Sequence, residues 1–306
     1  MKKKITFSFV LAHILLIVLV CLIFTPGEKQ VTTINSFLGA VAVMEIFYLF
    51  QLVRAEKKGK SAKAPSDIMV LLWGFLILWE VAVTKKQLLH PVLFPAPENV
   101  FHVFPTQYEA LMKNVLSSME LLAVGLLIGI TLGVVLGVIC GWFSRLTDIF
   151  YPVASVLAPI PAVVYAPYII ILMPSFRSAS AVIIILGIFF PTFLKMILRV
   201  GSIDPRILDS GRVLNIGSFQ MITKILLPYI MPEVISGLRI TVTTSISLLI
   251  FAEMMGATEG MGYYIVNFNT YANYTNVIAG FIVIGIVITI LGYVVSFIEK
   301  HAVKWQ

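Results

Sequence analysis

Residues 121–140 read LLAVGLLIGITLGVVLGVIC, a stretch without a single charged side chain. A helix of about 20 apolar residues is long enough to cross the hydrocarbon core of a bilayer. Runs of this kind recur along the chain, at about 5–24, 31–53, 67–84, 114–141, 150–173, 179–198, 229–255 and 275–297. They predict an all-α polytopic membrane protein with eight membrane-spanning helices.

The composition of the whole chain points the same way. Of the 306 residues, 59% are apolar and 12% are charged, whereas soluble domains have roughly 45–50% and about 25%. A soluble protein with a mean hydropathy of +0.99 would expose large apolar patches. The net charge of +7 would suggest nucleic acid in a soluble protein, but basic residues also gather in the cytoplasmic loops of membrane proteins. Composition therefore excludes a soluble enzyme and a nucleic-acid binder, and it makes membrane lipid the surroundings of the chain.

The distribution of basic residues predicts the orientation in the membrane. With a cytoplasmic N-terminus, 16 of the 22 Lys and Arg residues fall in cytoplasmic segments and 5 in external ones. The positive-inside rule requires this asymmetry, so both termini are predicted to face the cytoplasm. The first run follows Lys2, Lys3 and Lys4 but no small-residue cleavage site comes after it, which predicts an uncleaved membrane anchor.

A basic linker, RAEKKGKSAKAPS at 54–66, divides the chain. It ends an N-terminal extension with two helices, 1–66, and precedes a six-helix module, 67–306. The linker contains Gly59-Lys60-Ser61, but Arg54 stands where a phosphate-binding loop needs glycine, so no nucleotide site is predicted there.

The sequence has no ligand pattern for a metal. Its two cysteines lie alone within apolar runs, and its four histidines lack metal-ligand spacing. These residues are Cys21, Cys140, His13, His90, His102 and His301. No catalytic pair is recognised, so the chain is predicted to be neither a metalloprotein nor an enzyme.

The longest polar segment between two runs in the second half is 199–228, RVGSIDPRILDSGRVLNIGSFQMITKILLP. Asp204 is a favourable N-cap, and the proline after it suits the first position of a helix. Asn215 tolerates the left-handed conformation in which helices often end, and Ser218 can cap a second helix that runs to Ile225. The segment predicts two short helices, with a solvated connecting loop as the alternative.

This segment resembles the cytoplasmic loop of permease subunits of ATP-binding-cassette (ABC) importers. The signature of that loop is E-A-A, three residues, G, nine residues, I-x-L-P. With Pro228 on the final proline, the spacing places Ile225 on the isoleucine, Asn215 on the glycine and Asp209-Ser210-Gly211 on E-A-A. Four letters differ from the signature, although a carboxylate, small side chains and tolerance of the left-handed conformation are kept.

Three further segments resemble parts of the nitrate/sulfonate/taurine-type permeases. Residues 93–99, LFPAPEN, resemble the L-P-S-P segment after their first core span, and 157–168, LAPIPAVVYAPY, resemble their proline-rich third core span. Residues 237–262 resemble their G-L-R-I and A-E-M-L-G-A-x-x-G-L-G stretch. The four segments follow in the right order over about 90–297. The two N-terminal helices lie outside the resemblance.

The resemblance implies a type I ABC importer permease fold with six core helices and no cofactor in this chain. A second permease copy would complete a pathway across a bacterial cell membrane, and a separate ATPase subunit would bind ATP and Mg. An extracellular substrate-binding protein or lipoprotein would deliver a small organic solute or anion, such as a sulfonate, nitrate, a thiamine precursor or a riboflavin-like molecule. By position, the residues that couple to the ATPase would be Asp209, Ser210, Gly211, Asn215, Ile225 and Pro228.

The proline-rich run at 150–173 predicts a kinked membrane helix rather than a regular helix that faces lipid. Each interior proline removes a backbone hydrogen bond, and carbonyls freed in this way need protein or water as partners at membrane depth. Both are present along a pathway, although the tyrosines of this run could equally pack between helices. The candidate pathway residues are Pro159, Pro161, Tyr165, Tyr168, Arg239 and Glu253.

Two embedded carboxylates support an alternative function. Glu45 and Glu80 lie well inside predicted spans, where ionisable residues often mark a site. Three interpretations are open for this pair. The two carboxylates pair with each other across the helices of the N-terminal extension, they face a cavity, or they form the coupling site of an ion-driven secondary transporter. Glu120, Lys195 and Glu253 lie near the ends of spans, where they are expected to reach water.

Overall fold

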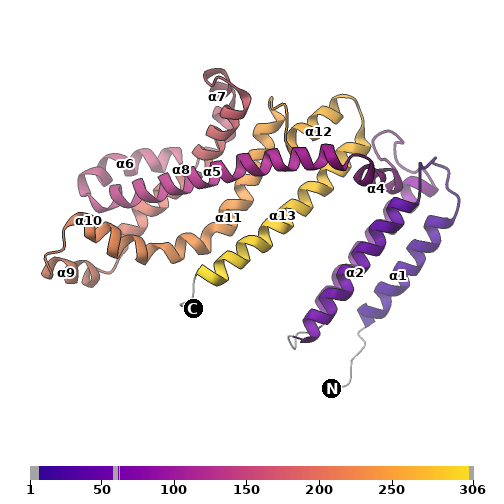
Figure 1. Cartoon of the computed structure of the whole chain (residues 1–306), viewed down its shortest axis with the longest axis horizontal. Helices are drawn as coiled ribbons and strands as arrows, with labels where there is room; N and C mark the ends of the chain where they lie inside the picture. Colours follow the sequence, from indigo (N-terminus) through magenta and orange to yellow (C-terminus); the bar gives the residue numbers. More distant parts are fainter. Residues whose placement is uncertain (1–6, 58–60, 62, 303–306) are drawn as a thin grey trace. The chain divides into compact units, whose positions relative to one another are not determined.

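The computed structural model describes residues 7–57, 61 and 63–302 (Figure 1). This part of the chain consists of helices and their connections and contains no strand, so the predicted all-α class is confirmed. The predictions for Lys2, Lys3, Lys4, Gly59 and Lys60 concern residues outside it. The described chain forms two compact units: the part up to Leu111 with Asn267–Ile282, and Met112–Val266 with the part from Val283 onward.

Seven stretches of helix in the described residues are long and apolar enough to cross a membrane. They are α1 (Phe7–Phe24), α2 (Asn35–Lys57), α3 with η1 (Lys63–Trp79, Glu80–Lys85), α5 (Tyr108–Trp142), α8 (Phe176–Gly201), α10 with η3 and α11 (Ser218–Gln220, Met221–Leu226, Leu227–Met254) and α13 (Tyr274–Ala302). An eighth candidate is bent by 85° and consists of α6 (Ser144–Leu157), η2 (Ala162–Tyr165) and α7 (Ala166–Leu172). The eight predicted spans are therefore present when the bent pair counts as one. Short helices are α4 (Pro97–Thr106), α9 (Pro205–Val213) and α12 (Met261–Thr270).

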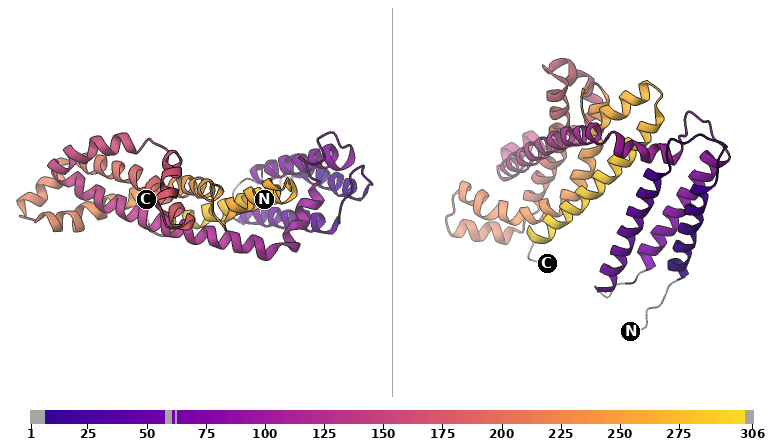
Figure 2. Two further views of the ribbon diagram at one scale, coloured as in Figure 1. Left: turned by 90° about the horizontal axis from the view of Figure 1, so that it is seen from above. Right: turned by 45° about the vertical axis from the view of Figure 1, so that its right-hand side comes forward.

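In the first unit, α1, α2 and α3 form a bundle (Figure 2). Trp73 and Phe37 are fully buried in its core, and Phe37 stacks on Phe101 of α4 with ring centroids 5.2 Å apart. The Tyr48 and Ser66 hydroxyls form a buried hydrogen bond of 2.9 Å that joins α2 to α3. Because α3 packs along α1, it shares a core with the N-terminal extension. The domain boundary after residue 66 stays a prediction.

The two embedded carboxylates of this unit have separate partners. Glu45 Oε1 lies 3.3 Å from His13 Nε2, an ion pair when His13 is protonated, which joins α1 to α2. Glu80 is fully buried and lies 2.9 Å from the Lys85 ammonium group. The suggestion that Glu45 and Glu80 pair with each other is therefore wrong.

A third buried carboxyl group lies outside the candidate spans. Glu98, in the first turn of α4, is 1% exposed and accepts a hydrogen bond of 3.1 Å from Thr84 Oγ1. Burial, and then the charge of the neighbouring Glu80, raises the pKa of Glu98 to about 7. Glu98 therefore changes its charge near neutral pH.

The second unit is built on a row of glycines. Every fourth residue of α5 from 125 to 141 is a glycine that faces α8: Gly125, Gly129, Gly133, Gly137 and Gly141. A Cβ atom at Gly137 would lie 2.6 Å from Met196 Cβ and 2.8 Å from the Phe193 carbonyl oxygen. Small residues at this spacing allow helices to approach closely in a membrane. The α5 backbone therefore lies directly against α8, and α11 packs on α8 in turn.

Candidate coupling loop and translocation cavity

The loop between α8 and α11 begins as its sequence predicts. The Arg206 N–H donates to Asp204 Oδ1 at 2.9 Å, and α9 starts at Pro205. An N-cap carboxylate satisfies an amide that has no partner within the helix, and proline at the first position loses no hydrogen bond. The predicted first helix and its cap are confirmed.

The end of α9 also agrees with the prediction. Asn215 has φ = 52°, in the left-handed region, and the Ile216 N–H donates to the Gly211 carbonyl oxygen at 3.0 Å. This geometry closes the C-terminus of the helix by returning the chain onto its last turn. Asn215 thus takes the role that glycine has in the signature of the resembling loops.

The second predicted helix is different from the expectation. Gly217 is the N-cap and Ser218 is the first helical residue, so Ser218 does not cap the helix. The helix also does not end at Ile225, because it continues through the π-helical segment η3 into α11. A wider turn directly before Pro228 accommodates a residue that has no N–H and whose ring crowds the preceding turn. The loop is therefore continuous with a long membrane helix.

Gly211 fastens α9 to this continuous helix. It is buried, and a Cβ atom at this position would overlap the Met221 side chain and lie 3.8 Å from Ile225 Cδ1. Asp209 and Ser210, on the same turn, are exposed. Close packing against η3 explains why glycine occupies the third position of the E-A-A-like triplet.

An apolar edge on the loop is exposed. Val213 is 83% exposed, Leu214 72% and Phe219 79%. These three residues, called the apolar edge below, flank the turn between α9 and α10. Apolar side chains on a short polar loop leave surface that a partner can bury.

Charged residues link α8 to α11 near the same end. One Glu233 carboxylate oxygen lies 2.6 Å from Arg199 Nε, and the other lies 3.3 Å from Lys195 Nζ. The Arg199 guanidinium also lies 5.5 Å from the Tyr229 ring centroid. Lys195 is exposed, as expected for a residue near the end of a span. Its partner Glu233 is not among the residues that the sequence singled out.

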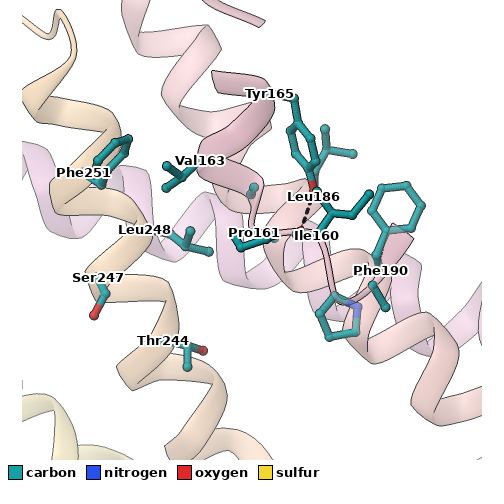
Figure 3. A pocket seen from close by; sticks show the side chains of 14 residues that line it. Ile160, Pro161, Val163, Tyr165, Leu186, Phe190, Thr244, Ser247, Leu248 and Phe251 are labelled. Atoms are coloured by element: carbon teal, nitrogen blue, oxygen red, sulfur yellow. Dashed lines mark hydrogen bonds between the residues drawn. The ribbon is translucent and has the colours of Figure 1, made fainter. Parts of the chain in front are cut away.

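The bent pair and two long helices border an open cavity of about 450 Å³ (Figure 3). Pro161 lines it from the break, Tyr165 from η2, Phe190 from α8, and Ser247 and Phe251 from α11. The helix is interrupted between Leu157 and Ala162, where Pro159 and Pro161 lie, so the prediction that this span is not a regular helix is confirmed. The residues that line the cavity in the described chain are apolar or carry hydroxyl groups, and none is charged.

The other candidate pathway residues are not among those that line the cavity. Pro159, Tyr168 and Arg239 are exposed on the chain surface. Glu253 is 2% exposed and accepts hydrogen bonds from Ser118 Oγ at 2.5 Å and from the Gly262 N–H at 2.8 Å. The expectation that Glu253 reaches water is therefore wrong, because a loop and α5 cover it.

Known proteins resemble this chain over most of its length. The family of the binding-protein-dependent transport system inner membrane component matches residues 129–305. A Bacillus subtilis permease protein named for the transport of aliphatic sulfonates is 27% identical over 165 residues, which are 54% of this chain and 60% of that relative. The taurine transport system permease protein of Escherichia coli is 23% identical over 246 residues, which are 78% of this chain and 87% of that relative.

The fold has a counterpart among solved structures. The inward-facing MetNI methionine ABC transporter matches with a TM-score of 0.53 and 16% identity, over 65% of this chain and 99% of the matched chain. The match shows the type I importer permease fold. Since the family match spans more than half of the residues, this chain is an ABC importer permease subunit and belongs to the family of binding-protein-dependent transport system inner membrane components.

Proposed function

We propose that this chain pairs with a second copy to form the translocation pathway of an ATP-driven importer. A separate ATPase, which binds ATP and Mg, docks on the loop 199–228, and an extracellular binding protein delivers the solute. The observation that carries the proposal is the continuity of the loop with α11, because the helix that lines the cavity begins in that loop.

The apolar edge supports the docking of a partner protein on this loop. Burying a Val, Leu or Phe side chain is worth about 1.5–3 kcal/mol. Val213, Leu214 and Phe219 could therefore supply several kcal/mol of attraction in a groove of the ATPase. Asp209 and Ser210 are exposed beside them and would contribute polar contacts at the rim.

A displacement of α9 can be transmitted to the wall of the cavity through η3, which packs against α9, and α11, which continues from η3. Gly211 holds α9 against Met221 in η3, and η3 continues into α11. Ser247 and Phe251 of α11 line the cavity. Closure of an ATPase pair would thus move the cavity wall as a rigid body, a recognised way of switching between two states.

The proposed orientation follows from the basic residues. The loop carrying Arg199, Arg206 and Lys224 would lie in the cytoplasm, together with both termini. The connection between α11 and α12 would then face the outside of a bacterial cell membrane, and the binding protein would dock on that side.

The proposed solute is a small organic molecule or anion, of the class to which sulfonates, nitrate, thiamine precursors and riboflavin-like molecules belong. Two relatives are named for sulfonate and taurine transport. The uncharged cavity lining supports a route that does not hold an anion by an ion pair. Selection would then take place mainly at the external binding protein.

Purification of the tagged chain from its native membrane in mild detergent, followed by mass spectrometry, tests the proposal. An ATPase in near-equal amount, with or without a binding lipoprotein, is the expected result. A chain that purifies alone and moves solute into vesicles without ATP would refute it. That second result would favour an ion-driven secondary transporter, in which Glu45 and Glu80 would be the first residues to replace.

A further inference from the structure

Glu253 lies in the last turn of α11, and both of its carboxylate oxygens accept hydrogen bonds. Ser118 Oγ of α5 donates to one oxygen, and the Gly262 N–H at the start of α12 donates to the other. Buried charged groups are rare in membrane helices and need partners of this kind. One side chain thus connects three separate segments of the second unit.

The same stretch of α5 also holds the neighbouring backbone of the loop. Ser118 Oγ accepts from the Met261 N–H at 2.8 Å, and Asn114 Oδ1 accepts from the Gly260 N–H at 2.8 Å. Three successive amides, those of residues 260 to 262, are therefore bound by side chains of α5 and α11. We call this set of contacts the Glu253 latch.

Glycines at two positions of the loop make the latch possible. Gly260 has φ = +130°, and a Cβ atom there would overlap the Glu253 carboxylate. A Cβ atom at Gly262 would overlap the Ile250 carbonyl oxygen. Only a chain without side chains at these positions brings its amides this close to α11.

The latch lies on the opposite side of α11 from the cavity. Phe251 lines the cavity, and Glu253 follows two residues later, which is about 200° around an α-helix. Fixing the carboxylate on α5 therefore fixes the rotation of the last turn of α11. This rotation decides whether Phe251 points into the cavity.

We propose that Glu253 is a positioning residue of the translocation route, which holds the end of α11 and residues 255–262 on α5 as one body and thereby directs Phe251 into the cavity. This inference rests on the proposed function, since the cavity is taken as part of the route. It gives Glu253 a role different from lining the pathway.

The first test measures amide exchange in the purified chain in lipid nanodiscs. Glu253→Met keeps the length of the side chain but removes both acceptors, whereas Glu253→Gln keeps one. Loss of a buried hydrogen bond should speed exchange at Gly262 by about tenfold or more in Glu253→Met, with Glu253→Gln in between. Glu259→Met is the matched control, because Glu259 lies in the same loop, 2.6 Å from Lys113, in an exposed ion pair whose loss has little effect.

The second test reports on the cavity. A Phe251→Cys chain in a Cys21→Ser background, with Cys140 buried, is labelled with a maleimide in the same nanodiscs. Adding Glu253→Met should change the labelling rate by about tenfold, and adding Glu259→Met should leave it unchanged. Unchanged exchange or labelling in Glu253→Met, or equal changes in the control, would overturn the proposal.

Both tests remain decisive if Glu253→Met fails to reach the membrane or if the importer assignment is wrong. If Glu253→Met does not reach the membrane, Ser118→Ala removes the hydroxyl that binds both the carboxylate and the Met261 N–H, and the same changes are expected. Both readouts use the chain without ATPase or binding protein. Failure of the importer assignment would instead appear as wild-type uptake that does not require ATP, with the exchange and labelling results standing on their own.

Discussion

Adding one methyl group to the glycine row of α5 should destabilise the protein measurably. In Gly137→Ala the new Cβ would lie 2.6 Å from Met196 Cβ and 2.8 Å from the Phe193 carbonyl oxygen, where ordinary contacts begin near 3.4 Å. The Phe193 oxygen belongs to the backbone and cannot rotate away. Relief of the overlap therefore requires α5 and α8 to separate by nearly 1 Å.

The energetic cost follows from that separation. A gap of about 0.5–1 Å removes roughly a quarter to a half of the dispersion energy of each contact along the row. Overpacking of this kind typically costs about 1–3 kcal/mol. Alanine also stabilises a helix by about 1 kcal/mol relative to glycine. The control variant must therefore also replace a helical glycine by alanine. Gly285→Ala in α13 is that control, because nothing lies within 4 Å of a Cβ atom there.

The assay is equilibrium unfolding of the purified chain by titration with sodium dodecyl sulfate. Gly137→Ala should unfold at a lower detergent fraction than Gly285→Ala, with a free energy of unfolding about 1–3 kcal/mol smaller. Gly133→Ala combined with Gly137→Ala should cost less than the sum of the two, because the first change already separates the helices. Equal stability of Gly137→Ala and Gly285→Ala would refute the direct contact of the α5 and α8 backbones.

Three further changes test other parts of the structure. Leu214→Asp on the apolar edge should reduce copurification of the ATPase by about tenfold without reducing the yield of the chain, whereas Thr223→Asp, an exposed residue of η3, should not. Asn215→Val should destabilise the end of α9 by about 1–2 kcal/mol, while Asn215→Gly should be tolerated, as measured by proteolysis within the loop, because a branched side chain disfavours φ = 52°. The pKa of Glu98 is raised from 4.5 in the unfolded chain to about 7 in the folded chain. The free energy of unfolding should therefore fall by about 3 kcal/mol as the pH rises from 4.5 through 7. Glu98→Gln should remove this pH dependence of unfolding, and a persistent slope in that variant would assign it to another group.

Local sequence patterns predict much of the fold and the first of the two helices in the loop 199–228. Apolar runs predict the spans because bilayer thickness sets a minimum length, and prolines predict that the span formed by α6, η2 and α7 is not a straight helix. Asn215 and Asp204 act through backbone groups only a few residues away, so their roles can be predicted from the sequence. The prediction for Ser218 is wrong because a cap and a first helical residue differ by one position. The π-helical segment that follows has no clear sequence signal.

Contacts between distant segments could not be predicted in this way. Glu253 lies near the end of a span, a position that usually indicates water, but its partner Ser118 is 135 residues away in the sequence. The glycine row is visible as a repeat of every fourth residue, yet only the structure shows that α8 is the helix it faces. The pairing of Glu45 with His13 likewise depends on which helices meet.

The contacts of α8 on its two sides differ in kind, and this difference indicates where motion can occur. Toward α5, the two backbones touch along the glycine row, so sliding would drive Met196 Cβ into the next turn of α5. Toward α11, side chains make the contacts: Leu248 of α11 lies against Gly187, and Ile184 and Leu249 belong to one buried cluster. Partly exposed ion pairs to Glu233 add little energy. Packed helices shift by small sliding movements of such side chains. We therefore expect α5, α8 and the end of α11 that Glu253 holds on α5 to move as one body, and the other end of α11, which Gly211 ties to the loop, to shift against them.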